Sequence, residues 1–99
     1  MKTDIIINLI KIFIDKYNSK DLSLEDILTF REEYDDLIDY NRDTIIAEIG
    51  KSNYELLDDI YMDLEMYEEN IDIRNNEKYC IDEHQLLKRI SEKYMKLYK

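Results

Sequence analysis

The chain has 99 residues, 44% of them hydrophobic, which is enough for one domain with one core and too few for two. Its formal net charge of −10 argues against nucleic acid and anionic membranes as partners, because both attract basic surfaces. With one glycine, no proline and one cysteine, we expect a single domain over residues 1–99 without linkers or an intrachain disulfide, in the reducing cytoplasm.

The amino-terminal segment predicts a helix that runs to about Tyr17, with Thr3 as its N-cap. Its apolar stripe recurs at the three- and four-residue spacing of a helix and comprises Ile6, Leu9, Ile10, Phe13 and Tyr17. Asn8 and Lys11 interrupt this segment, which is far shorter than the roughly 18 apolar residues of a membrane span. No small-residue cleavage site follows, so we expect a core helix and not an export signal.

A second helix is predicted to begin after Ser23, an N-cap with Asp26 three residues later, and to end near Tyr40. Leu22 and Ile27 stand at the two positions of a hydrophobic staple. The apolar stripe comprises Leu24, Ile27, Phe30, Tyr34, Leu37 and Ile38. Five acids farther along the helix also lie off this stripe and either extend an acidic face or are simply solvated: Glu32, Glu33, Asp35, Asp36 and Asp39.

Residues 44–49 then predict one or two helical turns, closed by Gly50. A third long helix is expected from Asn53 to Asp72, capped by Ser52 or Asn53. Its apolar stripe comprises Leu57, Ile60, Tyr61, Leu64 and Tyr67. The other positions are mostly acids without a balancing lysine or arginine: Glu55, Asp58, Asp59, Asp63, Glu65, Glu68, Glu69 and Asp72. Such repulsion costs a few tenths of a kcal/mol per pair, so this face requires an explanation.

Residues 70–80 predict a loop that packs Ile71, Ile73 or Tyr79 onto the core. The fourth long helix is expected after Asp82, an N-cap with Gln85 three residues later. Its apolar stripe comprises Leu86, Leu87, Ile90, Tyr94, Leu97 and Tyr98. We therefore predict an all-α fold, an antiparallel four-helix bundle with a short extra helical turn before the third long helix.

The acidity is concentrated in the middle of the chain. Residues 21–72 hold 18 acidic and 3 basic side chains, whereas residues 1–20 and 73–99 carry net charges of +2 and +3. A basic protein surface is the natural counterpart of such a segment.

Motifs for catalysis are lacking, and we expect neither enzymatic activity nor a catalytic residue, cofactor or metal. His84 is the only histidine, and Cys80 has neither an orienting third group nor a glycine-rich oxyanion loop beside it. Asp58, Asp59 and Asp63 could bind a divalent cation weakly, but the glycine-turn loop of a calcium site is missing. Most tyrosines belong to the core edge, while Tyr40, Tyr54 and Tyr79 are open to a core or an interface role.

The order of these features resembles the immunity proteins of colicin D and of contact-dependent inhibition systems. The residues that carry the resemblance are Met66-Tyr67-Glu68-Glu69 at the end of the third helix and Tyr79-x-Ile81-Asp82-x-x-x-Leu86. It implies a four-helix bundle that binds the nuclease domain of a cognate toxin, a tRNA-cleaving ribonuclease, and blocks its active site. The family's key acidic contacts correspond to Glu65, Glu68 and Asp72; Glu69-Asn70 departs from its pattern and implies a contact register shifted by one.

The acidic face leads to the same mechanism. Carboxylates held where RNA phosphates would lie can occupy a basic cleft as a substrate mimic. The predicted toxin-binding residues are Asp58, Asp59, Asp63, Glu65, Glu68, Glu69 and Asp72. We expect a monomer when free. The alternatives are an acidic DNA-mimicking or regulatory protein-binding module, and a helical subunit of a larger complex.

Overall fold

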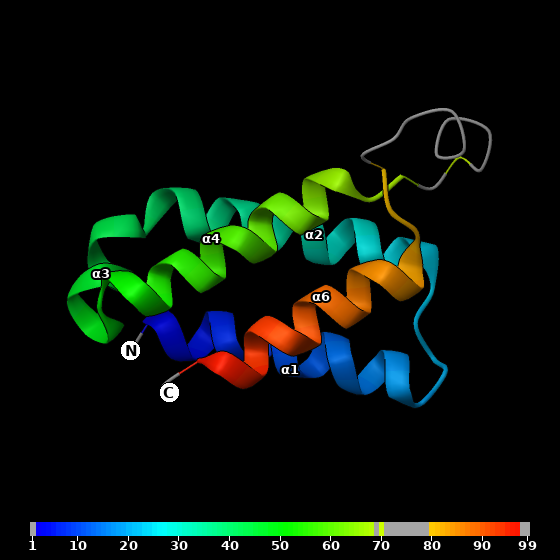
Figure 1. Cartoon of the computed structure of the whole chain (residues 1–99), viewed down its shortest axis with the longest axis horizontal. Coiled ribbons are helices and arrows are strands. Elements are labelled where there is room, and N and C mark those ends of the chain that lie inside the picture. The colour runs from blue at the N-terminus through cyan, green and yellow to red at the C-terminus, as the bar shows by residue number, and fades with distance from the viewer. Residues whose placement is uncertain (1, 69, 71–79, 98–99) are drawn as a thin grey trace.

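The computed structural model describes residues 2–68, 70 and 80–97, which contain five α-helices (Figure 1). Their bounds are α1 (Lys2–Asn18), α2 (Leu24–Tyr40), α3 (Arg42–Ile49), α4 (Lys51–Met66) and α6 (Glu83–Lys96). The all-α class is confirmed, and so is a short helix before the third long one. None of the helices in the described part of the chain is long and apolar enough to cross a membrane.

The four long helices lie side by side along the long axis of the molecule, and α3 closes one end (Figure 1). Helix α4 packs against α2, α3 and α6, while α1 packs against the same three helices from the other side. Different faces of α4 therefore contact different helices. This arrangement decides which side chains of α4 meet acids and which meet cations.

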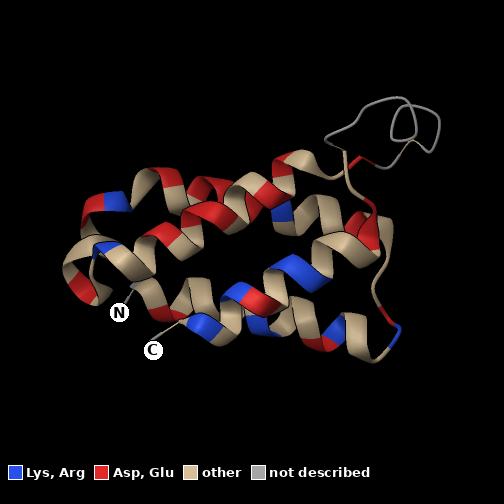
Figure 2. Ribbon diagram, in the orientation of Figure 1, with Lys and Arg blue, Asp and Glu red and all other residues tan. Residues whose placement is uncertain are grey.

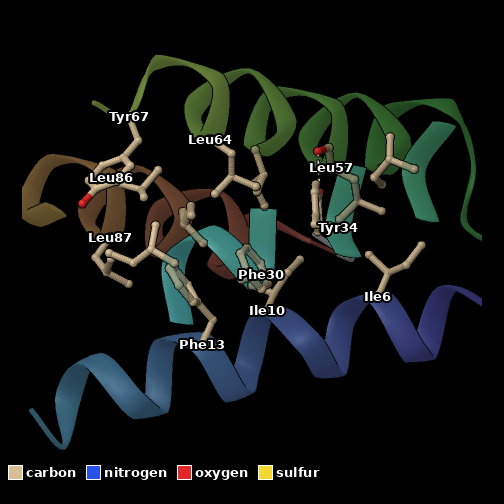
Figure 3. Close-up of a cluster of buried hydrophobic side chains, with 14 of the residues drawn as sticks. Ile6, Ile10, Phe13, Phe30, Tyr34, Leu57, Leu64, Tyr67, Leu86 and Leu87 are labelled. Carbon is tan, nitrogen blue, oxygen red and sulfur yellow. Dashed lines mark hydrogen bonds between the residues drawn. The ribbon is translucent and has the colours of Figure 1, made fainter. Parts of the chain in front are cut away.

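The core lies between the long helices (Figure 3). Side chains from the four long helices and from the short α3 contribute to it. Phe13 stacks on Phe30 with ring centroids 4.2 Å apart, which joins α1 to α2. The buried Tyr34 donates its hydroxyl hydrogen to the carbonyl oxygen of Leu57 at 2.5 Å, so its polar atom is satisfied inside the core. The buried apolar residues are Ile6, Ile10, Phe13, Ile27, Phe30, Tyr34, Ile38, Ile45, Tyr54, Leu57, Ile60, Leu64, Tyr67, Ile81, Leu86, Leu87, Ile90 and Leu97.

Two helix starts agree with the sequence because their signals are local. Ser23 Oγ accepts the Asp26 N–H at 3.1 Å, and Asp26 Oδ2 accepts the Ser23 N–H at 3.0 Å. This backbone hydrogen bond from Ser23 lowers the pKa of Asp26. Asp82 and Gln85 form the same reciprocal capping box at the start of α6.

Two other predicted caps are wrong. Thr3 lies inside α1, where it is buried and donates both its backbone N–H and its hydroxyl to Glu48 Oε1 of α3, at 3.0 and 2.6 Å. Helix α4 begins at Lys51, so neither Ser52 nor Asn53 caps it, and Asn53 instead donates to the Ile49 carbonyl at 2.8 Å. Gly50 ends α3 as predicted, with a φ of 88° that favours glycine.

Helix α4 also ends earlier than predicted, at Met66 and not at Asp72. Tyr67 is extended and forms an isolated parallel bridge with Ile81. The Ile81 N–H donates to the Met66 carbonyl at 2.9 Å, and the Glu68 N–H donates to the Ile81 carbonyl at 3.2 Å. This distant segment satisfies a carbonyl that the helix end leaves free. Ile71, Ile73, Tyr79 and Tyr98 lie outside the described residues.

Candidate protein-binding surface

Acidic and basic residues are distributed unevenly among the helices (Figure 2). Helix α2 carries seven acids and one arginine, and α4 carries five acids and one lysine. Helix α6 carries four lysines or arginines and two acids. Because α2 packs against α4, two acidic helices adjoin on one side of the molecule, whereas the cations of α6 adjoin the other side of α4.

Asp63 faces α6, and its expected place on the exposed acidic face is wrong. Its side chain is 5% exposed and forms a salt bridge with Lys93 Nζ. Arg89 Nη1 lies 3.6 Å from the other carboxylate oxygen of Asp63. Asp63 therefore holds α4 against α6 and is already neutralised within the molecule.

The other flank of α4 brings four carboxylates together around Tyr61. We call Asp35 and Asp39 of α2 together with Asp58 and Glu65 of α4 the acidic seam. Asp39 and Asp35, then partial burial, and then Glu65 and Asp58 raise the pKa of Tyr61. One phenol thus senses negative charge from two helices. Among the described residues, no lysine or arginine forms a salt bridge with any of the four carboxylates.

Within the acidic seam, the carboxyl group of Asp35 interacts with that of Glu65. Burial raises the pKa of Asp35 to about 7, and a hydrogen bond with the Glu65 carboxyl group adds to the rise. Asp35 Oδ1 is enclosed by protein and meets no donor in the part of the chain that the structure describes. Two ionised carboxylates can only accept hydrogen bonds, so a proton held between them makes this contact favourable.

Two arginines border the acidic seam without neutralising it. Arg31 lowers the pKa of Asp35, but this effect is smaller than the rise caused by burial and Glu65. Arg42 lies over the ring of Tyr54, 5.8 Å from its centroid. Burial, followed by the charge of Asp58, raises the pKa of Tyr54, while Arg42 lowers it. The seam therefore keeps a surplus of negative charge.

The predicted toxin-binding residues are only partly brought together. Asp58 and Glu65 are exposed in the acidic seam, and Asp59, next to Asp58 in the chain, is also exposed on α4. Glu68 is half-buried beyond the helix end, where its Oε1 accepts the Asn70 N–H at 3.0 Å. Glu69 and Asp72 lie outside the described residues.

Asp35 and Asp39 are missing from the set of predicted binding residues. Their position off the apolar stripe of the second helix was the available signal. That pattern alone could not separate a shared acidic face from a solvated one, because it does not reveal which helix lies alongside α2.

The histidine, the cysteine and the tyrosines with an open role lie outside the group of four carboxylates that forms the acidic seam. His84 is exposed, with Nδ1 2.5 Å from the Tyr17 hydroxyl oxygen, and Cys80 is a half-buried free thiol. Of the tyrosines left open, Tyr54 belongs to the core and Tyr40 is 85% exposed, whereas Tyr79 is outside the described residues. No group of three or more His, Cys, Asp or Glu side chains in the described ranges could hold a metal ion.

No protein-family model matches the chain, and neither a curated protein nor a solved structure matches it significantly.

Proposed function

We propose that this chain is an immunity protein that binds a cognate nuclease toxin, a tRNA-cleaving ribonuclease, and blocks its active site. The observation that carries the proposal is the acidic seam, in which two helices present Asp35, Asp39, Asp58 and Glu65 without a salt bridge among the described residues. The resemblance to colicin D-type immunity proteins supplies the class of partner. No catalytic step is part of this function.

A domain that cleaves RNA needs cationic side chains where the phosphates bind. Carboxylates at that place can accept charge-assisted and bidentate hydrogen bonds from arginine, which are stronger than hydrogen bonds between neutral groups. The acidic seam would thus replace the phosphate backbone and exclude the substrate from the cleft.

The energetics of the free protein favour such a partner. Carboxylates that repel one another destabilise the free surface, and cations from a partner relieve that repulsion on binding. Complementary charge also speeds association, toward about 10⁸–10⁹ M⁻¹s⁻¹ at low salt. Fast association suits the inhibition of a toxin inside the cell that makes it.

The scaffold must hold the carboxylates in place for this mechanism. In our proposal the four long helices form an antiparallel four-helix bundle, with α2 and α4 as neighbouring members. The apolar contacts between them, together with the hydrogen bond from the Tyr34 hydroxyl to the Leu57 carbonyl, limit the movement of the acids relative to one another. A preformed surface loses less conformational entropy when it binds.

The test is a double charge reversal in the acidic seam, Asp58→Lys with Glu65→Lys. The probe is the catalytically inactivated nuclease domain encoded next to the gene for this chain. We expect at least about a 100-fold loss of affinity, mostly through slower association, because like charges would then face each other across the interface. Surface plasmon resonance gives both rate constants.

A matched control separates local charge from net charge. Asp15→Lys with Glu92→Lys changes the net charge equally, at exposed positions on α1 and α6. We expect this variant to bind within about threefold of the parent, since more distant charges are screened. Equal losses for both double variants, or no binding by the parent chain, would refute the proposed function.

A further inference from the structure

Met62 is an exposed apolar side chain surrounded by acids. It lies on α4 and is 54% exposed. Asp58, Asp59 and Glu65 stand four residues before, three residues before and three residues after it, the spacings that make neighbours on a helix surface. All three carboxylates are exposed, so three of the four helical neighbours of this large apolar side chain are acids, and the fourth is the half-buried Met66.

The fold does not explain a methionine at this position. Met62 is absent from the buried core and from the half-buried side chains packed against it. Met66, one turn later, differs because it is half-buried and its sulfur accepts a hydrogen bond from Arg89 at 3.7 Å. Glutamate or lysine would serve an exposed helix position as well as methionine does, since their helix propensities are similar.

We propose that Met62 is the apolar anchor of the interface and inserts into an apolar recess of the partner that is bordered by lysines and arginines. The inference rests on the proposed function and identifies which side chain prolongs the complex. Charge complementarity identifies the occupant: three carboxylates around Met62 require cations around the matching recess. The partner is thus a basic protein domain, not an acidic helix or a second copy of this acidic face.

The residues at this position have the composition of an interface centre. Methionine and aromatic residues are enriched in the centres of protein interfaces, where surrounding polar groups exclude water. Tyr61, half-buried beside Met62 in the chain, supplies an aromatic neighbour within the acidic seam. A flexible thioether also adapts to a recess of irregular shape.

Two kinds of side chain in this arrangement should control different rate constants of binding. Charges at the rim of an interface act mainly on the association rate, because they steer the encounter. A desolvated apolar anchor acts on the dissociation rate, because its contacts exist only in the formed complex. Substitution of Met62 should therefore change a different rate constant from charge reversal in the acidic seam.

The experiment compares Met62→Ala with Met95→Ala against the same inactivated nuclease domain. Met95 is a matched control, since it is 65% exposed on α6 outside the acidic seam. For Met62→Ala we expect about a tenfold faster dissociation with an association rate within about twofold of the parent. Met95→Ala should leave both rate constants unchanged.

A third variant tests whether apolar character is needed. Met62→Gln keeps the length of the side chain and its helix propensity but adds a polar amide. We expect it to dissociate at least as fast as Met62→Ala, with an unchanged melting temperature because the position is exposed.

Unchanged dissociation of both Met62 variants would overturn the anchor. If charge reversal at Asp58 and Glu65 still weakened binding, the proposed function would stand without it. Failure of the parent chain to bind would overturn both together.

Discussion

Both flanks of α4 carry carboxylate side chains, but these side chains have opposite electrostatic surroundings on the two flanks. Toward α6, Asp63 is buried and forms salt bridges with Lys93 and Arg89. Toward α2, Glu65 meets Asp35, and the pKa of Asp35 rises to about 7. The neighbouring helix, and not the acid itself, decides whether a carboxylate serves the fold or remains available to a partner.

The largest expected effect comes from breaking the neutralised flank. We expect Asp63→Ala to lower the free energy of unfolding by about 2–3 kcal/mol, because it leaves the cations of α6 without their buried partner. The loss falls below that of a fully buried pair, since the Lys93 side chain is 21% exposed and can reach water. Urea unfolding followed by circular dichroism measures the difference.

Asp59→Ala is the matched control, one turn earlier on α4 and exposed. Its effect should stay within about 0.5 kcal/mol. If Asp63→Ala proved equally neutral, the salt bridge with Lys93 would not hold α4 against α6.

The second effect concerns the opposite flank and depends on pH. The folded-state pKa of Asp35, about 7, lies above its unfolded value of 3.8, so the folded state binds more protons between these two values. The stability contributed by this group is fully present below pH 3.8 and is lost as pH rises through 7. Asp35→Asn imitates the protonated side chain and removes this dependence.

At pH 8 we therefore expect Asp35→Asn to be more stable than the parent by about 1 kcal/mol, a value reduced for partial exposure of the carboxyl group. At pH 3.5 the two proteins should be equally stable. Asp36→Asn, at an exposed neighbouring position, should show neither behaviour. A gain for Asp35→Asn that did not change with pH would contradict a proton shared with Glu65.

The smallest expected effect is the dependence of stability on salt concentration, which should differ between variants of the two flanks. Raising NaCl from about 0.05 to about 0.5 M should stabilise the parent by about 0.5 kcal/mol, because salt screens the partly exposed repulsion in the acidic seam. Asp35→Asn should reduce this gain, whereas Asp63→Ala should retain it, since a buried pair is screened much less. Equal salt responses in all three proteins would remove the distinction between the flanks.

Local features of the chain were predictable because their causes lie within one or two helical turns. Ser23 and Asp82 begin their helices with partners three residues away, and Gly50 ends α3 at a positive φ. The stripes of α2 and α6 placed Ile27, Tyr34 and Ile90 in the core, because helical spacing alone aligns them. The concentration of acid in the middle of the chain likewise required only counting.

Tertiary packing decided the features with distant partners. The Thr3 hydroxyl donates a hydrogen bond to Glu48, and Asp63 forms a salt bridge with Lys93. Helix α4 ends at Met66, whose carbonyl accepts a hydrogen bond from the Ile81 N–H. No short window of sequence contains both members of such a pair. The amino-acid sequence thus determined that this protein is helical and acidic in its middle. Only the packing of α4 between α2 and α6 determined which of its acids are neutralised, since charge interactions depend on spatial neighbours and not on order in the chain.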